Sequence, residues 1–180
     1  MAHFHYTIMG GLIFAMFAGF YYWFPKITGK TLNRKLSKWH FWTFFIFFNL
    51  TFFPMFIIGL LGQPRRVFTY AKNLQGLNDF SSISAFLLGL SFLLFLFNLL
   101  YSLWINPVKA SSNPWDSLGL EWQTASPIPP HNFDRIPVIM SDPYHYSEEG
   151  APPLADFGDN QRVTASSTAS AGAPASANEQ

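Results

Sequence analysis

Residues 3–23 read HFHYTIMGGLIFAMFAGFYYW and contain no Lys, Arg, Asp or Glu. An α-helix needs about 20 predominantly apolar residues to cross the hydrocarbon core of a bilayer. This stretch therefore predicts a membrane-spanning helix from about residue 3 to about residue 24, ended by Pro25 and Gly29. No basic segment precedes the stretch and no small-residue cleavage site follows it, so it is not interpreted as a signal peptide.

Two further charge-free runs, residues 39–64 and 80–108, predict two more membrane-spanning helices. We expect them at about 37–61, interrupted by Pro54, and at about 81–105, ended by Pro107. The predicted fold class is an all-α integral membrane protein whose region 1–108 holds three transmembrane helices. Buried helices of a soluble protein would rarely produce three apolar runs of this length.

The remainder of the chain has a different composition. Residues 109–140 are rich in Pro, Ser and Asn and predict an extended segment packed on a neighbouring surface. Its candidate anchors are Trp115, Leu118, Trp122, Phe133 and Ile136. Residues 141–180 are of low complexity and predict a disordered tail.

The absence of cysteine from the whole chain excludes disulfides and thiolate metal sites.

The charges are unevenly distributed between the two connections. The first connection carries five cations and no acid: Lys26, Lys30, Arg34, Lys35 and Lys38. The positive-inside rule places it on the cytoplasmic side, or on the matrix side in an organelle. The N-terminus and the second connection then lie outside and the C-terminal tail inside. Membrane lipid is the expected surrounding, and no feature indicates a nucleic-acid partner.

His3 and His5 are the first candidate functional residues. At about 100° per residue, two helical positions two apart point roughly 200° apart, so the imidazoles cannot share one metal ion. They can serve two centres, one on each face, with Phe4 between them. Imidazole is a usual axial ligand of haem iron. The residues alone leave haem ligation, a proton relay and a simple interfacial location open.

Arg65 and Arg66 form the second candidate site, in the connection on the same side as the histidines. Guanidinium groups bind carboxylates in a bidentate manner, so haem propionates are natural partners. Contact with lipid phosphate, or simple solvation, remains an alternative. No nucleophile, paired carboxylates or phosphate-binding loop is recognised, so no catalytic residue is assigned.

Five segments together carry a family resemblance. Residues 3–23 resemble the tenth transmembrane helix of cytochrome c oxidase subunit I, in the haem–copper oxidase superfamily. The segments NLTFFP (49–54) and GQPRR (62–66) are similar to its eleventh helix and the loop that follows. NPWDSLGLEW (113–122) and SPIPPHNF (126–133) resemble its C-terminal tail. The resemblance covers about residues 1–140 and implies the last three helices of a twelve-helix subunit.

The resemblance also implies roles for single residues. His3 would ligate a high-spin haem that faces copper, and His5 a low-spin haem. Phe4 would lie between the two haems, and Arg65 and Arg66 would hold the propionates. The implied cofactors are two haems of the A type. The implied activity is electron transfer from cytochrome c to oxygen with proton pumping.

The chain lacks other parts of the family pattern. The copper-binding histidines and the other low-spin ligand belong to earlier helices, and Phe56 stands where the family commonly has histidine. We therefore expect a C-terminal piece, inactive alone, that needs the N-terminal portion of subunit I together with subunits II and III. A quinol oxidase fragment and a haem-free structural fragment are the alternatives. The expected location is a bacterial inner membrane, with the mitochondrial inner membrane as the second possibility.

Overall fold

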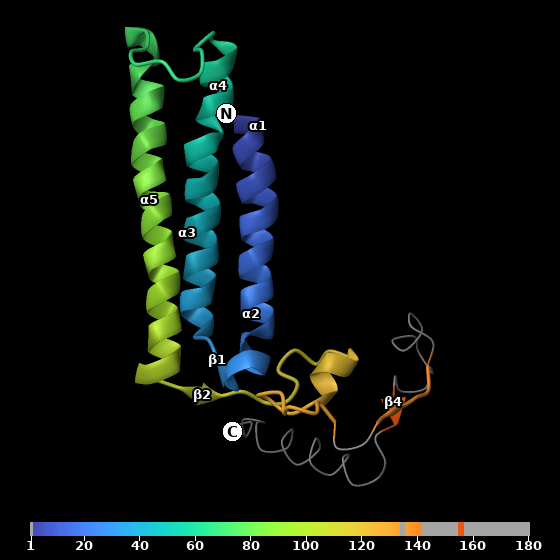
Figure 1. Cartoon of the computed structure of the whole chain (residues 1–180). Helices are drawn as coiled ribbons and strands as arrows, with labels where there is room; N and C mark the ends of the chain where they lie inside the picture. The colour runs from blue at the N-terminus through green and yellow to red at the C-terminus, as the bar shows by residue number, and fades with distance from the viewer. Residues whose placement is uncertain (1, 134–135, 142–154, 157–180) are drawn as a thin grey trace, which may run out of the picture. The chain divides into compact units, whose positions relative to one another are not determined.

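The computed structural model describes residues 2–133, 136–141 and 155–156 (Figure 1). Three helical segments are long and apolar enough to cross a membrane, which confirms the predicted fold class. Their elements are α1 (Ala2–His5), the π-helix η1 (Tyr6–Ile13) and α2 (Phe14–Thr28); α3 (Arg34–Phe52) and α4 (Pro54–Leu60); and the 3-10 helix η2 (Lys72–Leu74), α5 (Gln75–Leu100) and the π-helix η3 (Tyr101–Ile105).

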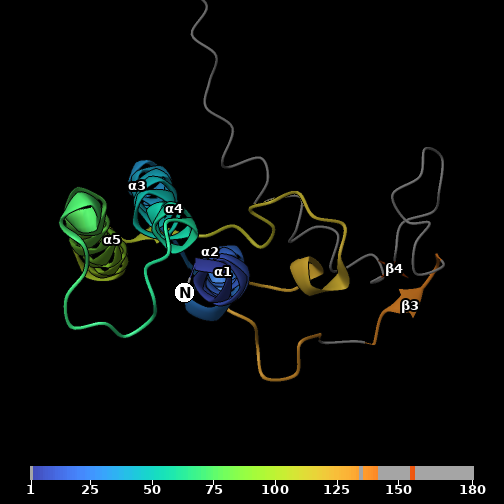
Figure 2. The ribbon, with the colours of Figure 1, turned by 90° about the horizontal axis from the view of Figure 1, so that it is seen from above.

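The chain divides into two compact units, which are described separately. The first consists of residues 1–22 and 32–107, and the second of residues 23–31 and 108–180. In the first unit, α3 lies between α5 and the first helical segment, as the view from above shows (Figure 2). The second helical segment therefore packs against both of its neighbours.

Two helix ends differ from the sequence prediction. The first helical segment continues through Pro25 to Thr28 and ends at Gly29, whose φ of 68° is strained for any residue with a side chain. α5 begins at Gln75 rather than near residue 81. The prediction took the helix from the charge-free run, whereas the structure adds polar turns containing Asn78 and Asp79 beyond that run.

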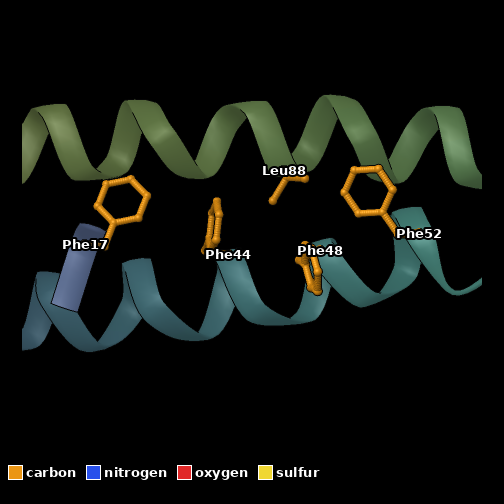
Figure 3. Packing of buried hydrophobic residues seen from close by; sticks show 5 residues of the cluster. All are labelled: Phe17, Phe44, Phe48, Phe52 and Leu88. Atoms are coloured by element: carbon orange, nitrogen blue, oxygen red, sulfur yellow. The ribbon is translucent and has the colours of Figure 1, made fainter. Parts of the chain in front are cut away.

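The core of the first unit is aromatic (Figure 3). Its buried members are Phe17, Phe44, Phe48, Phe52 and Leu88. Phe17 and Phe44 meet edge to face, with ring centroids 5.5 Å apart and planes inclined by 73°. This is a favoured arrangement of aromatic pairs. The first helical segment is thereby held against α3.

Several polar residues of α5 lie inside the bundle. Its buried positions recur at intervals of three, four or seven residues, continuing into η3: Ser81, Ser84, Leu88, Ser91, Asn98 and Ser102. Large apolar side chains occupy the outside, where Phe86 is 81% exposed. Small and polar residues let membrane helices approach closely and bond to one another. The buried serines and Asn98 thus lie on the packing face of this helix.

A hydrogen-bonded network joins the N-terminal end of α3 to the C-terminal end of the third helical segment. Asn98 Nδ2 donates to Ser37 Oγ at 3.0 Å, and Ser102 Oγ donates to Asn98 Oδ1 at 3.2 Å. The backbone N–H of Asn33 donates to Ser102 Oγ at 3.0 Å. Each of these side chains therefore finds a partner away from lipid, as polar groups inside a membrane require.

At Phe53 the second helical segment is interrupted, between the end of α3 and Pro54 at the start of α4. Proline cannot donate a backbone hydrogen bond, so it weakens the helix that precedes it. Next to this break, Ser81 Oγ of α5 donates to the carbonyl oxygen of Thr51 at 2.6 Å. A neighbouring helix thus supports the interrupted backbone.

In the second unit, the end of the first helical segment packs against the tail. Lys26 Nζ donates to the carbonyl oxygen of Thr124 at 2.6 Å and lies 5.2 Å from the ring centroid of Trp122. Trp122 is fully buried, whereas Ile136 is 95% exposed. Trp122 therefore packs within this unit, and Ile136 does not.

Short strands and a single helical turn complete this unit. β1 (Lys30–Thr31) pairs with β2 (Val108–Lys109), and β3 (Val138–Ile139) pairs with β4 (Ala155–Asp156), both antiparallel; η4 covers Leu120–Gln123. β4 falls within the segment predicted to be disordered. Apart from residue 141 and β4, that predicted tail lies outside the described residues.

Substituting Ser81 tests the interhelical bond at the Phe53 break. Ser81→Ala should lower the stability of the membrane-embedded protein by about 0.6–1 kcal/mol, because a typical hydrogen bond between membrane helices contributes this much. The measurement is the unfolding midpoint in a denaturing-detergent titration. Ser82→Ala is the matched control, because Ser82 is exposed and bonds only to Asn78 of its own helix. Equal midpoints for the two variants would contradict the assigned role.

Candidate haem-ligand site

The histidine pair lies on α1, where the first helical segment meets the break in the second. The imidazole of His5 stacks on Phe52, with centroids 4.5 Å apart and planes inclined by 14°. His3 meets Phe56 at 4.8 Å, with planes inclined by 81°. Phe52 and Phe56 are one helical turn apart, so both imidazoles are supported by the same neighbouring segment.

Stacking determines how the His5 ring can bind a ligand. The lone pairs of imidazole lie in the ring plane, so a ring that stacks flat on Phe52 directs its nitrogen atoms away from the phenyl face. Phe4 meets the same imidazole almost perpendicularly, at 5.5 Å and 88°. Phe4 itself is 61% exposed and His3 is exposed. The contacts with Phe52 and Phe4 therefore constrain the plane of the His5 ring. The side chains of His3 and Phe4 face away from the bundle.

A π-helical stretch follows the histidines directly. In η1 the backbone bonds run from residue i to i+5, which widens the helix, and such stretches are frequent at functional sites. Tyr6, its first residue, donates from Oη to Asn49 Oδ1 at 2.8 Å. Asn49 in turn donates from Nδ2 to the carbonyl oxygen of Phe45. Sequence reasoning assigned no role to Tyr6 or Asn49, although a polar residue in the middle of a predicted span was a usable signal.

The arginine loop lies at the same end of the bundle as the N-terminus (Figure 1). Arg65 and Arg66 are both exposed, and Arg66 has a φ of 57°. The loop is tied to α5 by a pair of amides. Gln63 Nε2 donates to Asn78 Oδ1 at 3.3 Å, and Asn78 Nδ2 donates to Gln63 Oε1 at 3.0 Å. This pair holds the start of the loop next to α5.

One further histidine, His40, is separate from the site. It is 2% exposed and lies in the aromatic core, with Nδ1 3.0 Å from the hydroxyl of Tyr21. Its Nε2 has no hydrogen-bond partner among the described residues. In the sequence His40 stands between Trp39 and Trp42, which are typical of the membrane interface, so an interfacial location is expected. The structure instead places it among Phe17 and Phe44.

The donor set suits haem better than a protein-ligated metal ion. Within the described part of the chain, no group of three or more His, Cys, Asp or Glu side chains could hold a metal ion. A haem needs only one or two axial ligands from protein because the porphyrin supplies the other four, and imidazole is a usual choice. Two single imidazoles, with guanidinium groups at the same end, fit that requirement.

The fold and this site define a helical membrane protein with a candidate haem-binding end. A family model described as cytochrome C and quinol oxidase polypeptide I matches residues 1–87. Quinol oxidase subunit 1 of Bacillus spizizenii is 42% identical over 154 residues, covering 83% of this chain and 24% of the relative. Cytochrome c oxidase subunit 1 of Synechocystis sp. is 46% identical over 146 residues, covering 81% and 26%.

A third relative is the putative cytochrome c oxidase subunit 1-beta of Streptomyces coelicolor, 47% identical over 145 residues, with 79% of this chain and 25% of the relative covered. The chain belongs to the haem–copper oxidase subunit I family. It spans about a quarter of the length of the curated relatives it matches. The family also confirms that this is a membrane protein.

The amide pair beside the arginine loop can be tested by hydrogen exchange. Asn78→Ala removes both bonds to Gln63 and should speed backbone exchange across residues 62–71 about tenfold. The reason is that two partly exposed hydrogen bonds together contribute about 1–2 kcal/mol. Asn73→Ala is the control, because Asn73 is an exposed amide of the neighbouring turn. Unchanged exchange in the Asn78 variant would show that the loop is held by other contacts.

Proposed function

We propose that this chain is the C-terminal segment of subunit I of a terminal respiratory oxidase, and that it supplies one axial histidine to each of two haems. The observation that carries the proposal is the coincidence of His3, His5 and the Arg65–Arg66 loop at one end of a bundle whose family is that of haem–copper oxidases. A bound haem supplies reversible one-electron chemistry at its iron and, where an axial position is open, a place for oxygen.

The two histidines have different tasks in this proposal. His5, stacked on Phe52, presents a ring of defined orientation to the low-spin haem. His3, exposed and supported by Phe56, serves the high-spin haem. Phe4 lies between them in sequence and fills the space that separates the two haems. Both imidazoles must be neutral at the ligating nitrogen.

The arginines complete the site by compensating charge. Haem propionates are carboxylates, and guanidinium groups remain charged and bind carboxylates through two parallel hydrogen bonds. Arg65 and Arg66 would hold the propionates on the outer side of the membrane. Their positive charge disfavours the oxidised, more positive haem, so they would raise its reduction potential.

The chain works only within a complex in this proposal. No cluster of metal ligands occurs among the described residues, so the copper ligands would come from the N-terminal portion of subunit I. Subunits II and III and cytochrome c would be further partners. The haems would be of the A type and the activity that of cytochrome c oxidase with proton pumping. The relatives reported above are bacterial, which favours a bacterial plasma membrane, with the C-terminal tail on the cytoplasmic side.

Quinol oxidation is the second candidate function. Similar identities link the chain to a quinol oxidase subunit 1 and to cytochrome c oxidase subunits 1. The residues described here are equally suited to both enzymes, because the electron donor binds elsewhere. Comparing the turnover of the purified complex with reduced cytochrome c and with a quinol distinguishes the two.

Substituting the histidines tests the haem assignment. His5→Ala should abolish the low-spin signal in a reduced-minus-oxidised spectrum of the complex purified through this chain. His3→Ala should abolish the signal that shifts on binding carbon monoxide. His131→Ala, at an exposed position in the tail, is the control and should leave both signals in place. If each variant instead lost the signal expected of the other, the two haem assignments would be exchanged. If the wild-type complex contained no haem, the chain would be a haem-free structural fragment.

The role of the arginines is tested by redox titration. Arg65→Ala should lower the midpoint potential of the low-spin haem by tens of millivolts, because a partly exposed charge pair is worth up to about 1 kcal/mol and about 59 mV corresponds to a tenfold change in a one-electron equilibrium. Lys72→Ala removes an exposed cation from the same connection and should change the potential less. Equal potentials in the wild type and the Arg65 variant would reject propionate binding.

A further inference from the structure

The outer face of α3 carries an exposed group of cations at its N-terminal end. Arg34, Lys35 and Lys38 are all exposed. Lys35 and Lys38 are three residues apart, which places their Cβ atoms about 5–6 Å from each other on one side of the helix. Their ammonium groups can therefore reach a single anionic group together.

These cations have no acidic counterpart nearby in the helix. The first turn of α3 contains no acid, and the sequence has no Asp or Glu before Asp79, which lies near the N-terminal end of α5, the end that follows the second connection. Cations at the positive end of a helix dipole are unfavourable unless an anion balances them. The Asn33 side chain already accepts from the backbone N–H groups of Lys35 and Leu36. The lysine side chains, not the backbone amides, therefore define this surface.

Below the cations the same face becomes aromatic and then apolar. At about 100° per residue, Lys35, Lys38 and Trp42 lie within about 40° of the direction opposite the buried His40. Trp42 is 56% exposed, and Trp39, which lies at the side of this face about 80° from that direction, is 66% exposed. Tryptophan is enriched where the hydrocarbon core meets the headgroups.

Further along, the exposed side chains near this direction are apolar, namely Phe45, Ile46 and Phe53, and the half-buried Asn49 among them has its amide bonded to Tyr6 and to the carbonyl oxygen of Phe45. At 1.5 Å per residue, the distance from Trp42 to Phe53 is about 16 Å, or about half the hydrocarbon thickness of a bilayer. The order of side chains along the exposed face of α3 thus matches the order of chemical groups in one leaflet of a bilayer. Cations come first, at the level of the headgroups, then indoles, and then apolar side chains over about the length of one acyl chain.

We propose that this face of α3 is a binding site for an anionic phospholipid. The phosphate lies between Lys35 and Lys38, the indoles of Trp39 and Trp42 lie at the level of the ester groups, and an acyl chain covers Phe45 and Ile46. The inference goes beyond the oxidase function and does not depend on haem ligation. It names a lipid as the occupant because the charge, the aromatic pair and the apolar length match a phospholipid in both chemistry and order.

The charge of the headgroup follows from the side of the membrane. The positive-inside rule places the N-terminal end of α3 on the inner face, where anionic lipids attract basic segments next to membrane helices. Zwitterionic phospholipids offer the same acyl chains without net charge. Selectivity between the two headgroups is therefore the property that this site confers.

The test uses the membrane complex that contains the full chain, reconstituted into nanodiscs doped with photoreactive phosphatidylglycerol or photoreactive phosphatidylcholine. Mass spectrometry then measures the cross-linked fraction of peptides from residues 39–53. The wild type should cross-link the anionic lipid severalfold more than the zwitterionic lipid. Lys35→Gln and Lys38→Gln should each reduce this preference about fivefold, as expected for one charge near the membrane surface.

Lys72→Gln is the matched control, because it removes an exposed lysine at the opposite end of the bundle and should leave the preference unchanged. Both substitutions on α3 affect exposed side chains, so the complex should assemble normally, and its yield verifies this. Equal cross-linking by the two lipids would overturn the proposal. Absence of any lipid cross-link would overturn it as well, because another protein surface would then cover this face.

Discussion

The structure depends on one constraint: a polar group that faces hydrocarbon must find its partner within the protein. α5 meets this constraint by burying Ser81, Ser84, Ser91 and Asn98 within the bundle, while large side chains such as Phe86 face outward. The bonds from Ser81 to the Thr51 carbonyl and from Asn98 to Ser37 then tie the two helices near both of their ends. Because of these bonds, α5 is firmly attached to α3.

The position of the candidate site follows from this packing. α3 and α4 are braced by α5, and they in turn offer Phe52 and Phe56 to the two imidazoles. At the same end, the amide pair formed by Gln63 holds the start of the arginine loop. The site is thus assembled from all three helical segments. The exposed cations Arg34, Lys35 and Lys38 lie at the other end of α3, so the two proposed sites are at opposite ends of this helix.

Much of the fold could be predicted because charge-free length and proline position are physical requirements of membrane helices. The three spans and the break at Pro54 followed directly. The buried face of α5 and the core position of His40 were not predicted, although the serines and Asn98 of α5 were a usable signal for its packing face. The π-helical backbone of η1 was missed because it depends on tertiary packing. Histidine and arginine could be proposed as site residues from their chemistry, whereas Asn78 could not, because its amide contacts only Gln63 and the backbone of its own helical segment.

The contact between Lys26 and the tail has a consequence for the order in which the chain is made. The bond from Lys26 Nζ to the Thr124 carbonyl joins residues 98 positions apart. During synthesis the first helix is therefore complete long before the segment that receives its terminal cation has left the ribosome. Until then, the buried ammonium group of the finished protein has neither this carbonyl nor the indole of Trp122. The last turn of the first helix thus reaches its final environment only after all three helices have been translated.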